Sequence, residues 1–342
     1  MFVFGGFNSG TCYNDLYVFD MTRHVWKEIN YMKNHSAIPD GRASHSMCTS
    51  VDETKIYLFG GSGPHWGANN MGKLMEFSIK DEIWAEVTTV GQHPPPGYGQ
   101  SLCSVGKKLF LFGGTTGHQY LNDLYVFDLT SGKWKREHPT GDIPSPRYKH
   151  QVVVHESSMF LFGGGMYDAP VGEIDVYRLD TTTLTWFRIE ERVEGNEDGE
   201  EGEVPCSRIA HSVAKTKDHR VYVFGGRDEN QKRLNDLHIF NISTLEWELE
   251  KEQTGQPEPL DFHSAAAYDG EMFIFGGSDG QDRNNQVVRY QSTFTPSSLM
   301  ILAAKHIQQN IPACRLPRLP VELQRTLTYM NPDVRSTTNL SF

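Results

Sequence analysis

Four histidines recur at one position of an internal pattern in this sequence, and histidine is the side chain best suited to proton transfer near neutral pH. They are His45, His150, His211 and His263. No His-Glu-x-x-His, Gly-x-Ser-x-Gly or phosphate-binding glycine loop accompanies them. Because the same residue recurs from unit to unit, we expect these histidines to make structural hydrogen bonds. We therefore predict a non-catalytic protein, with no catalytic residue, no metal site and no cofactor.

The elements that carry these histidines belong to a repeated β unit, seen best at residues 108–134. The apolar run at 109–112 predicts a strand buried on both faces, and the glycine pair at 113–114 ends it. A second strand is expected at 124–128, and Trp134 begins a third. Such a unit cannot bury its own faces, so we expect it to stack against copies of itself.

The copies recur at intervals of 50 to 62 residues. The second glycine of each pair is Gly6, Gly61, Gly114, Gly164, Gly226 or Gly277. A tryptophan follows five of the pairs, at Trp26, Trp84, Trp134, Trp186 and Trp247. Arg-x-x-His opens a further strand at Arg42, Arg147 and Arg208. Four strands per unit at this period resemble the kelch repeat, which implies an all-β, six-bladed β-propeller.

We assign residues 1–292 to this propeller and expect a short helical tail after it. The blades are expected near residues 1–31, 42–88, 97–137, 147–189, 208–249 and 262–292. The first unit lacks its Arg-x-x-His strand, and the sixth unit lacks its tryptophan strand. We interpret the first blade as N-terminally truncated, since the alternative, an open ring, leaves an unpaired edge strand.

Composition restricts the protein's setting. The formal net charge of −11 argues against nucleic acid as the main partner. Five scattered cysteines, without signal peptide or apolar membrane-spanning run, predict reduced thiols and no membrane association. We expect a cytoplasmic protein and leave nuclear localisation open. Residues 190–203 carry eight carboxylates and are expected to form a flexible acidic loop, with binding of a basic partner as the alternative.

After Pro296 the sequence takes a helical period, with apolar residues on one face. Within this segment Ser298, Leu299, Ala303 and Ile307 resemble the elongin-binding box of ubiquitin-ligase receptors. The resemblance implies that Leu299 fills a pocket on elongin C while the small Ala303 allows close approach. The alternative is a helix packed against the propeller.

A second segment resembles the neighbouring cullin-binding box of the cullin-2 type. Its residues are Leu316, Pro317, Leu319, Pro320 and Leu323. Both boxes lie within 296–328, and residues 329–342 are expected to be disordered. A kelch propeller followed by these boxes resembles the kelch-repeat substrate receptors of cullin-2 ubiquitin ligases. That family resemblance implies elongin B, elongin C and cullin-2 as partners.

The same resemblance implies that the propeller binds the C-terminal tails of client proteins, often ending in glycine, at one mouth of its channel. The positions that correspond to the mouth are Ser44, Tyr98, Tyr148, Lys149, Arg227, Arg233 and Phe262, with Tyr167 nearby. Trp66, outside the repeat register, is either an anchor for the client or loop packing. Arginine forks and Lys149 suit a carboxylate. Asp261 either repels that carboxylate or pairs with an arginine and orients it.

Two functions follow from this sequence. The first is a substrate adaptor that binds a client tail through the propeller and elongins B and C through the tail helix. The second is a kelch scaffold without ligase function, for a cytoskeletal or signalling partner. The tail separates them, because a plain scaffold has no reason to expose Leu299 and Ile307.

Overall fold

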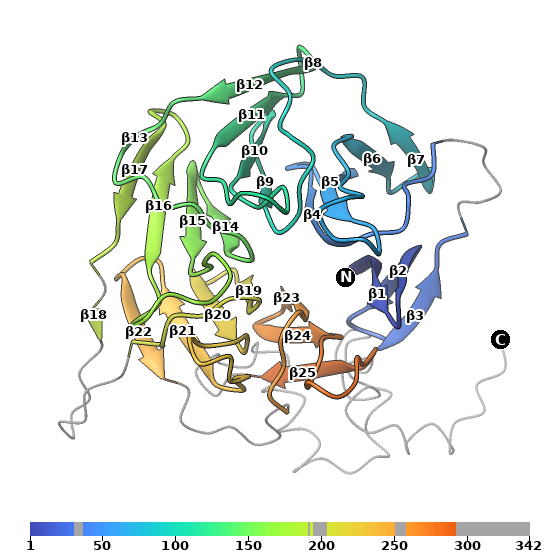
Figure 1. Cartoon of the computed structure of the whole chain (residues 1–342). Coiled ribbons are helices and arrows are strands. Elements are labelled where there is room, and N and C mark those ends of the chain that lie inside the picture. Colours follow the sequence, from blue (N-terminus) through green and yellow to red (C-terminus); the bar gives the residue numbers. More distant parts are fainter. Residues whose placement is uncertain (31–36, 191, 194–203, 250–257, 292–342) are drawn as a thin grey trace, which may run out of the picture.

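The computed structural model describes residues 1–30, 37–190, 192–193, 204–249 and 258–291. Every regular element in these ranges is a β-strand, and the strands form six sheets arranged in a ring (Figure 1). Residues from the first strand of each blade border a central channel. The prediction of an all-β, six-bladed propeller is therefore confirmed. The expected tail helix (296–328), its elongin and cullin boxes, the C-terminus (329–342) and most of the acidic loop lie outside the described residues.

The six blades follow one another along the chain. Blade 1 is β1 (Phe2–Asn8), β2 (Thr11–Asp20) and β3 (Val25–Glu28). Blade 2 is β4 (Ala43–Thr49), β5 (Lys55–Ser62), β6 (Met75–Ser78) and β7 (Ile83–Glu86). Blade 3 is β9 (Ser101–Val105), β10 (Lys108–Phe112), β11 (Leu124–Asp128) and β12 (Lys133–Glu137), with β8 (Val90–Gly91) at its edge.

The second half of the ring repeats this plan. Blade 4 is β14 (Gln151–His155), β15 (Ser158–Phe162), β16 (Val176–Asp180) and β17 (Thr185–Arg188), with β13 (Thr140–Gly141) at its edge. Blade 5 is β19 (Ser212–Lys215), β20 (Arg220–Phe224), β21 (Leu237–Asn241) and β22 (Glu246–Leu249), with β18 (Arg192–Val193) at its edge. Blade 6 is β23 (Ser264–Tyr268), β24 (Glu271–Phe275) and β25 (Val287–Gln291).

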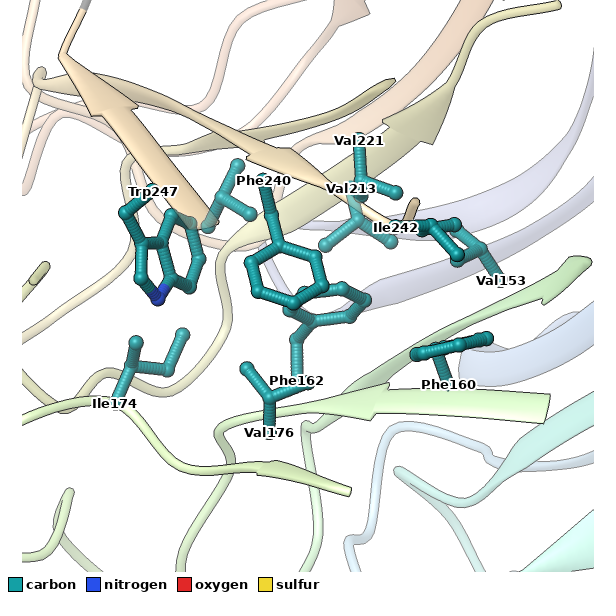
Figure 2. Packing of buried hydrophobic residues seen from close by; sticks show 11 residues of the cluster. Val153, Phe160, Phe162, Ile174, Val176, Val213, Val221, Phe240, Ile242 and Trp247 are labelled. Atoms are coloured by element: carbon teal, nitrogen blue, oxygen red, sulfur yellow. The ribbon is translucent and has the colours of Figure 1, made fainter. Parts of the chain in front are cut away.

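Tryptophans join neighbouring blades by packing on a phenylalanine of the preceding blade. Trp134 lies 5.7 Å from Phe59 between ring centroids, and Trp186 lies 5.0 Å from Phe112. Between blades 4 and 5, Trp247 packs with Phe162 and with Phe240 of its own blade (Figure 2). The same contact closes the ring, because Trp26 of blade 1 lies 5.3 Å from Phe275 of blade 6. Aromatic burial of this kind contributes to the cohesion between blades.

The arginine of each Arg-x-x-His segment donates a hydrogen bond to a main-chain carbonyl group of its own blade. Arg147 donates to the carbonyl oxygen of Gly163 in its own blade (2.9 Å) and pairs through two nitrogens with Asp175. The ring of His263 is 3.1 Å from the carbonyl oxygen of Phe224 in the preceding blade. Burial lowers the pKa of His150 to about 3 and that of His263 to about 4. These rings are thus neutral at physiological pH, which supports a structural role for them.

Candidate functional site: the mouth of the channel

Five main-chain positions form a belt around one mouth of the channel. Each precedes the histidine or glutamine of its blade and has a left-handed backbone, with φ between 53° and 67°: Ser44, Gly99, Lys149, Ala210 and Phe262. From Gly99 onward, each N–H donates to the carbonyl oxygen of the previous member, beginning with Gly99 to Ser44 (2.8 Å) and ending with Phe262 to Ala210 (3.0 Å). The belt connects blades 2 to 6 through main-chain hydrogen bonds, which leaves its side chains available at the mouth.

The channel is a cavity of about 1480 Å³. Several predicted site residues border it: Ser44, Trp66, Tyr98, Tyr148, Lys149 and Phe262. Arg227, Arg233 and Tyr167 do not border it; the first two lie beside Phe262 and Asp261, and Tyr167 has 76% of its surface exposed. The volume exceeds that of a typical small-molecule pocket, so the mouth can admit a peptide.

Aromatic rings line one half of the mouth. Trp66 lies between Phe7 and Tyr98, with centroid distances of 6.0 and 5.3 Å. Tyr98 then contacts Tyr148 at 6.3 Å, and Tyr148 contacts Tyr120 at 5.2 Å. Burial raises the pKa of Tyr98, Tyr120 and Tyr148, so their hydroxyl groups stay neutral. This half presents flat apolar surfaces and neutral hydroxyl groups to a ligand.

Cations gather around Phe262 on the other half. The Nζ atom of Lys149 is 4.3 Å from the ring centroid of Phe262 and 4.5 Å from that of Tyr148. The guanidinium carbons of Arg227 and Arg283 lie 5.2 and 5.6 Å from the Phe262 centroid. Burial, and then the charge of Arg227, lower the pKa of Lys149 from 10.5 to about 8. The mouth is therefore amphipathic, aromatic on one side and cationic on the other.

Asp261 lies beneath this cationic half and is fully buried. Its carboxylate oxygens are 2.8 Å from Nε of Arg227 and 3.2 Å from Nε of Arg233. Both contacts are ion pairs, and among the described residues neither oxygen of the Asp261 carboxylate accepts a hydrogen bond. Of the two roles that the sequence left open for Asp261, the structure shows pairing with the arginines. Asp261 thereby links blade 6 to blade 5.

Phe7 and Arg283 belong to the mouth although the sequence did not predict them. Both border the cavity, and the guanidinium carbon of Arg283 lies 5.2 Å from the ring centroid of Phe7. A repeat signal for Arg283 existed, because it makes the β-bridge in blade 6 that Arg233 makes in blade 5. No group of three or more potential metal ligands clusters in the described ranges, and no helix there could span a membrane.

Six blades that each carry a glycine pair, around a channel with an open mouth, are typical of a kelch-repeat propeller. The chain belongs to the family described as the KLHDC2/KLHL20/DRC7 Kelch-repeats domain, whose model matches residues 1–200 and 175–305. Kelch propellers are typically non-catalytic interaction domains, so the fold indicates protein–protein interaction. A role in protein–protein interaction agrees with both functions predicted from the sequence.

Three curated relatives show how far the similarity extends. Kelch domain-containing protein 10 of Xenopus laevis is 28% identical over 333 residues, which cover 93% of this chain and 78% of that protein. The Homo sapiens protein of that name is 28% identical over 293 residues, covering 81% of this chain and 63% of that protein. Host cell factor of Drosophila melanogaster is 28% identical over 327 residues, covering 84% of this chain and 20% of that protein.

Proposed function

We propose that this protein is the substrate-binding adaptor of a cullin-2 ubiquitin ligase. In this proposal the mouth of the propeller binds the C-terminal tail of a client, and the segment around Leu299 binds elongin C of the elongin B–elongin C pair. The chain performs no chemistry itself. Ubiquitin transfer then depends on the proximity that two linked binding events create. The compartment we propose is the cytoplasm, with the nucleus open.

The observation that supports tail binding is the division of the mouth into a cationic and an aromatic half. A chain end carries a carboxylate, which suits Lys149 and the neighbouring guanidinium groups. The residues just before that end need a surface for their side chains, which Trp66 and Tyr98 provide. A cavity of about 1480 Å³ leaves room for several residues of an entering tail.

The support for the ligase half of the proposal comes from the sequence. Leu299, Ala303 and Ile307 have the spacing of an elongin-binding helix, and the cullin-type segment from Leu316 to Leu323 follows. The alternative is a kelch scaffold without ligase function, which uses the same mouth for a cytoskeletal or signalling partner. The two differ only in whether the chain captures the elongins.

One bridging experiment tests both halves of the proposal. Two peptide libraries with randomised last residues are immobilised on beads, one with free C-terminal carboxylates and one with amidated ends. Purified chain and elongin B–elongin C are added together. We expect the carboxylate beads to retain the chain at least tenfold better than the amide beads, and to retain elongins only when the chain is present.

The variant Leu299→Asp should remain on the carboxylate beads but lose the elongins, because a charge replaces the pocket-filling side chain. Gln308→Asp, on the opposite side of the expected helix, is the matched control and should keep them. Retention of the chain without elongins would favour the scaffold. Equal retention on both kinds of bead would contradict tail binding.

A further inference from the structure

Four cations contact Phe262 or Asp261, and two of them have no carboxylate partner in the described part of the chain. Arg227 and Arg233 share the buried carboxylate of Asp261. By contrast, the partners found for Lys149 and Arg283 in the same ranges are aromatic rings. An ammonium group that is largely removed from water is stabilised by an anion, because burial of an unpaired charge is costly. Lys149 therefore contacts no anion among the described residues, and a ligand can supply one.

The same two cations are the ones that face the channel. Lys149 and Arg283 both border the cavity, whereas Arg227 and Arg233 do not. Both lie against the exposed ring of Phe262, with Nζ of Lys149 at 4.3 Å and the guanidinium carbon of Arg283 at 5.6 Å from its centroid. An anion that enters the cavity beside Phe262 therefore meets Lys149 and Arg283 before it meets the other two cations.

Arg227 and Arg233 have structural work that explains their presence without a ligand. They extend from blade 5, are joined to each other by a β-bridge, and contact Asp261 of blade 6. Arg227 also donates to the side-chain oxygen of Gln231 at 2.8 Å. Two guanidinium groups around a fully buried carboxylate compensate a charge that would otherwise be very costly to bury.

We infer that Lys149 and Arg283, on either side of Phe262, are the pair that receives the carboxylate of the entering tail. Asp261 acts as an internal carboxylate that holds Arg227 and Arg233 in the contact between blades 5 and 6. This inference rests on the proposed function, which supplies the carboxylate ligand. Of the three cations that the sequence offered for the carboxylate, it keeps Lys149 and replaces Arg227 and Arg233 by Arg283, which the sequence did not predict.

The test uses the free-acid and amide peptide beads with single methionine variants, which keep an apolar stem but remove the charge. For Lys149→Met and Arg283→Met we expect the preference for free-acid beads to fall roughly tenfold or more. Arg227→Met and Arg233→Met should lower the melting temperature but keep that preference while the protein is folded. Lys149→Arg and Arg283→Lys, which retain the charge, should keep most of the preference for free-acid beads.

The variants Lys149→Met and Arg283→Met decide the outcome even if Arg227→Met or Arg233→Met fails to fold. Both side chains border the open channel, so a folded protein is expected, and a melting curve verifies it. Unchanged preference in both folded variants would overturn the inference while leaving tail binding intact. If the wild-type chain itself shows no preference for free-acid beads, the proposed tail binding fails, and the inference fails with it.

Discussion

The ionisation of a single lysine connects the geometry of the mouth to its binding properties. Lys149 faces Tyr148 and Phe262, with Arg227, Arg283 and Asp261 as the charged groups nearby. Burial and the positive neighbours make its charged form unfavourable, and its pKa is about 8. A bound carboxylate has the opposite effect, because it favours the ammonium form. Binding of the tail and protonation of Lys149 should therefore be coupled.

This coupling predicts that the affinity for free-acid peptides falls as the pH rises from 7 to 9. The ammonium form decreases from about nine tenths to about one tenth of the free protein over this range, so the loss should approach tenfold. Retention on the free-acid beads at pH 7, 8 and 9 measures the effect. In Lys149→Arg the profile should be flat, and a flat wild-type profile would refute the coupling.

At the scale of an element, the second glycine of the pairs in blades 2 to 6 lies against the backbone at or just before the start of the first strand of its own blade. Gly114 has φ of +90°, and a Cβ there would lie 2.8 Å from Cβ and 2.9 Å from the main-chain nitrogen of Gln100. Both the backbone conformation and the space therefore require glycine. The strand β10 ends at this point because the chain must pass close to the strand that begins at Ser101.

We predict that Gly114→Ala lowers the free energy of unfolding by more than the roughly 1–3 kcal/mol expected for a strained backbone alone. Gly10→Ala is the matched control, since Gly10 has φ of +84° but no neighbouring atom within 4 Å of its added Cβ. Urea unfolding of both variants separates conformational strain from steric overlap. Equal losses in the two variants would show that the close contact with Gln100 costs nothing.

The sequence predicted these elements well because their signals are local and repeated. Runs such as 109–112 and the glycine pairs are sufficient to place strands and to count blades. The sequence offered pairing with an arginine as one of two roles for Asp261 but could not choose, since the contacts with Arg227 and Arg233 depend on how blades 5 and 6 meet in space. Arg283 was missed although it corresponds to Arg233 of blade 5, because its contacts with Phe7 and Phe262 depend on how blades 1 and 6 meet.

At the scale of the whole molecule, the ring closes where blade 1 meets blade 6. Trp26 packs on Phe275 there but keeps 39% of its surface exposed, whereas Trp134 is 1% exposed. A hydrogen bond from Thr22 to the hydroxyl oxygen of Tyr268 (3.3 Å) adds to this contact. The junction between blades 1 and 6 thus buries less of its tryptophan than the junction between blades 2 and 3.

We predict that Trp134→Ala reduces the free energy of unfolding by about 3–5 kcal/mol, as for a fully buried tryptophan, and that Trp26→Ala reduces it by clearly less. Hydrogen exchange should also report the difference by position. Trp26→Ala should accelerate exchange in β1–β3 and β23–β25 and leave β9–β12 protected. A comparable loss of unfolding free energy in both variants would contradict this prediction. The junction between blades 1 and 6 would then depend on Trp26 as strongly as the junction between blades 2 and 3 depends on Trp134.

The belt around the mouth has a consequence for how this protein can acquire new specificities. Its hydrogen bonds join main-chain atoms only, so substitutions at Ser44, Lys149, Ala210 or Phe262 change what the mouth recognises without removing a bond of the belt. Their left-handed conformation favours glycine, asparagine and aspartate and disfavours valine, isoleucine and threonine. The belt already carries side chains as different as those of serine, lysine, alanine and phenylalanine, so recognition can change at these positions while the ring is preserved.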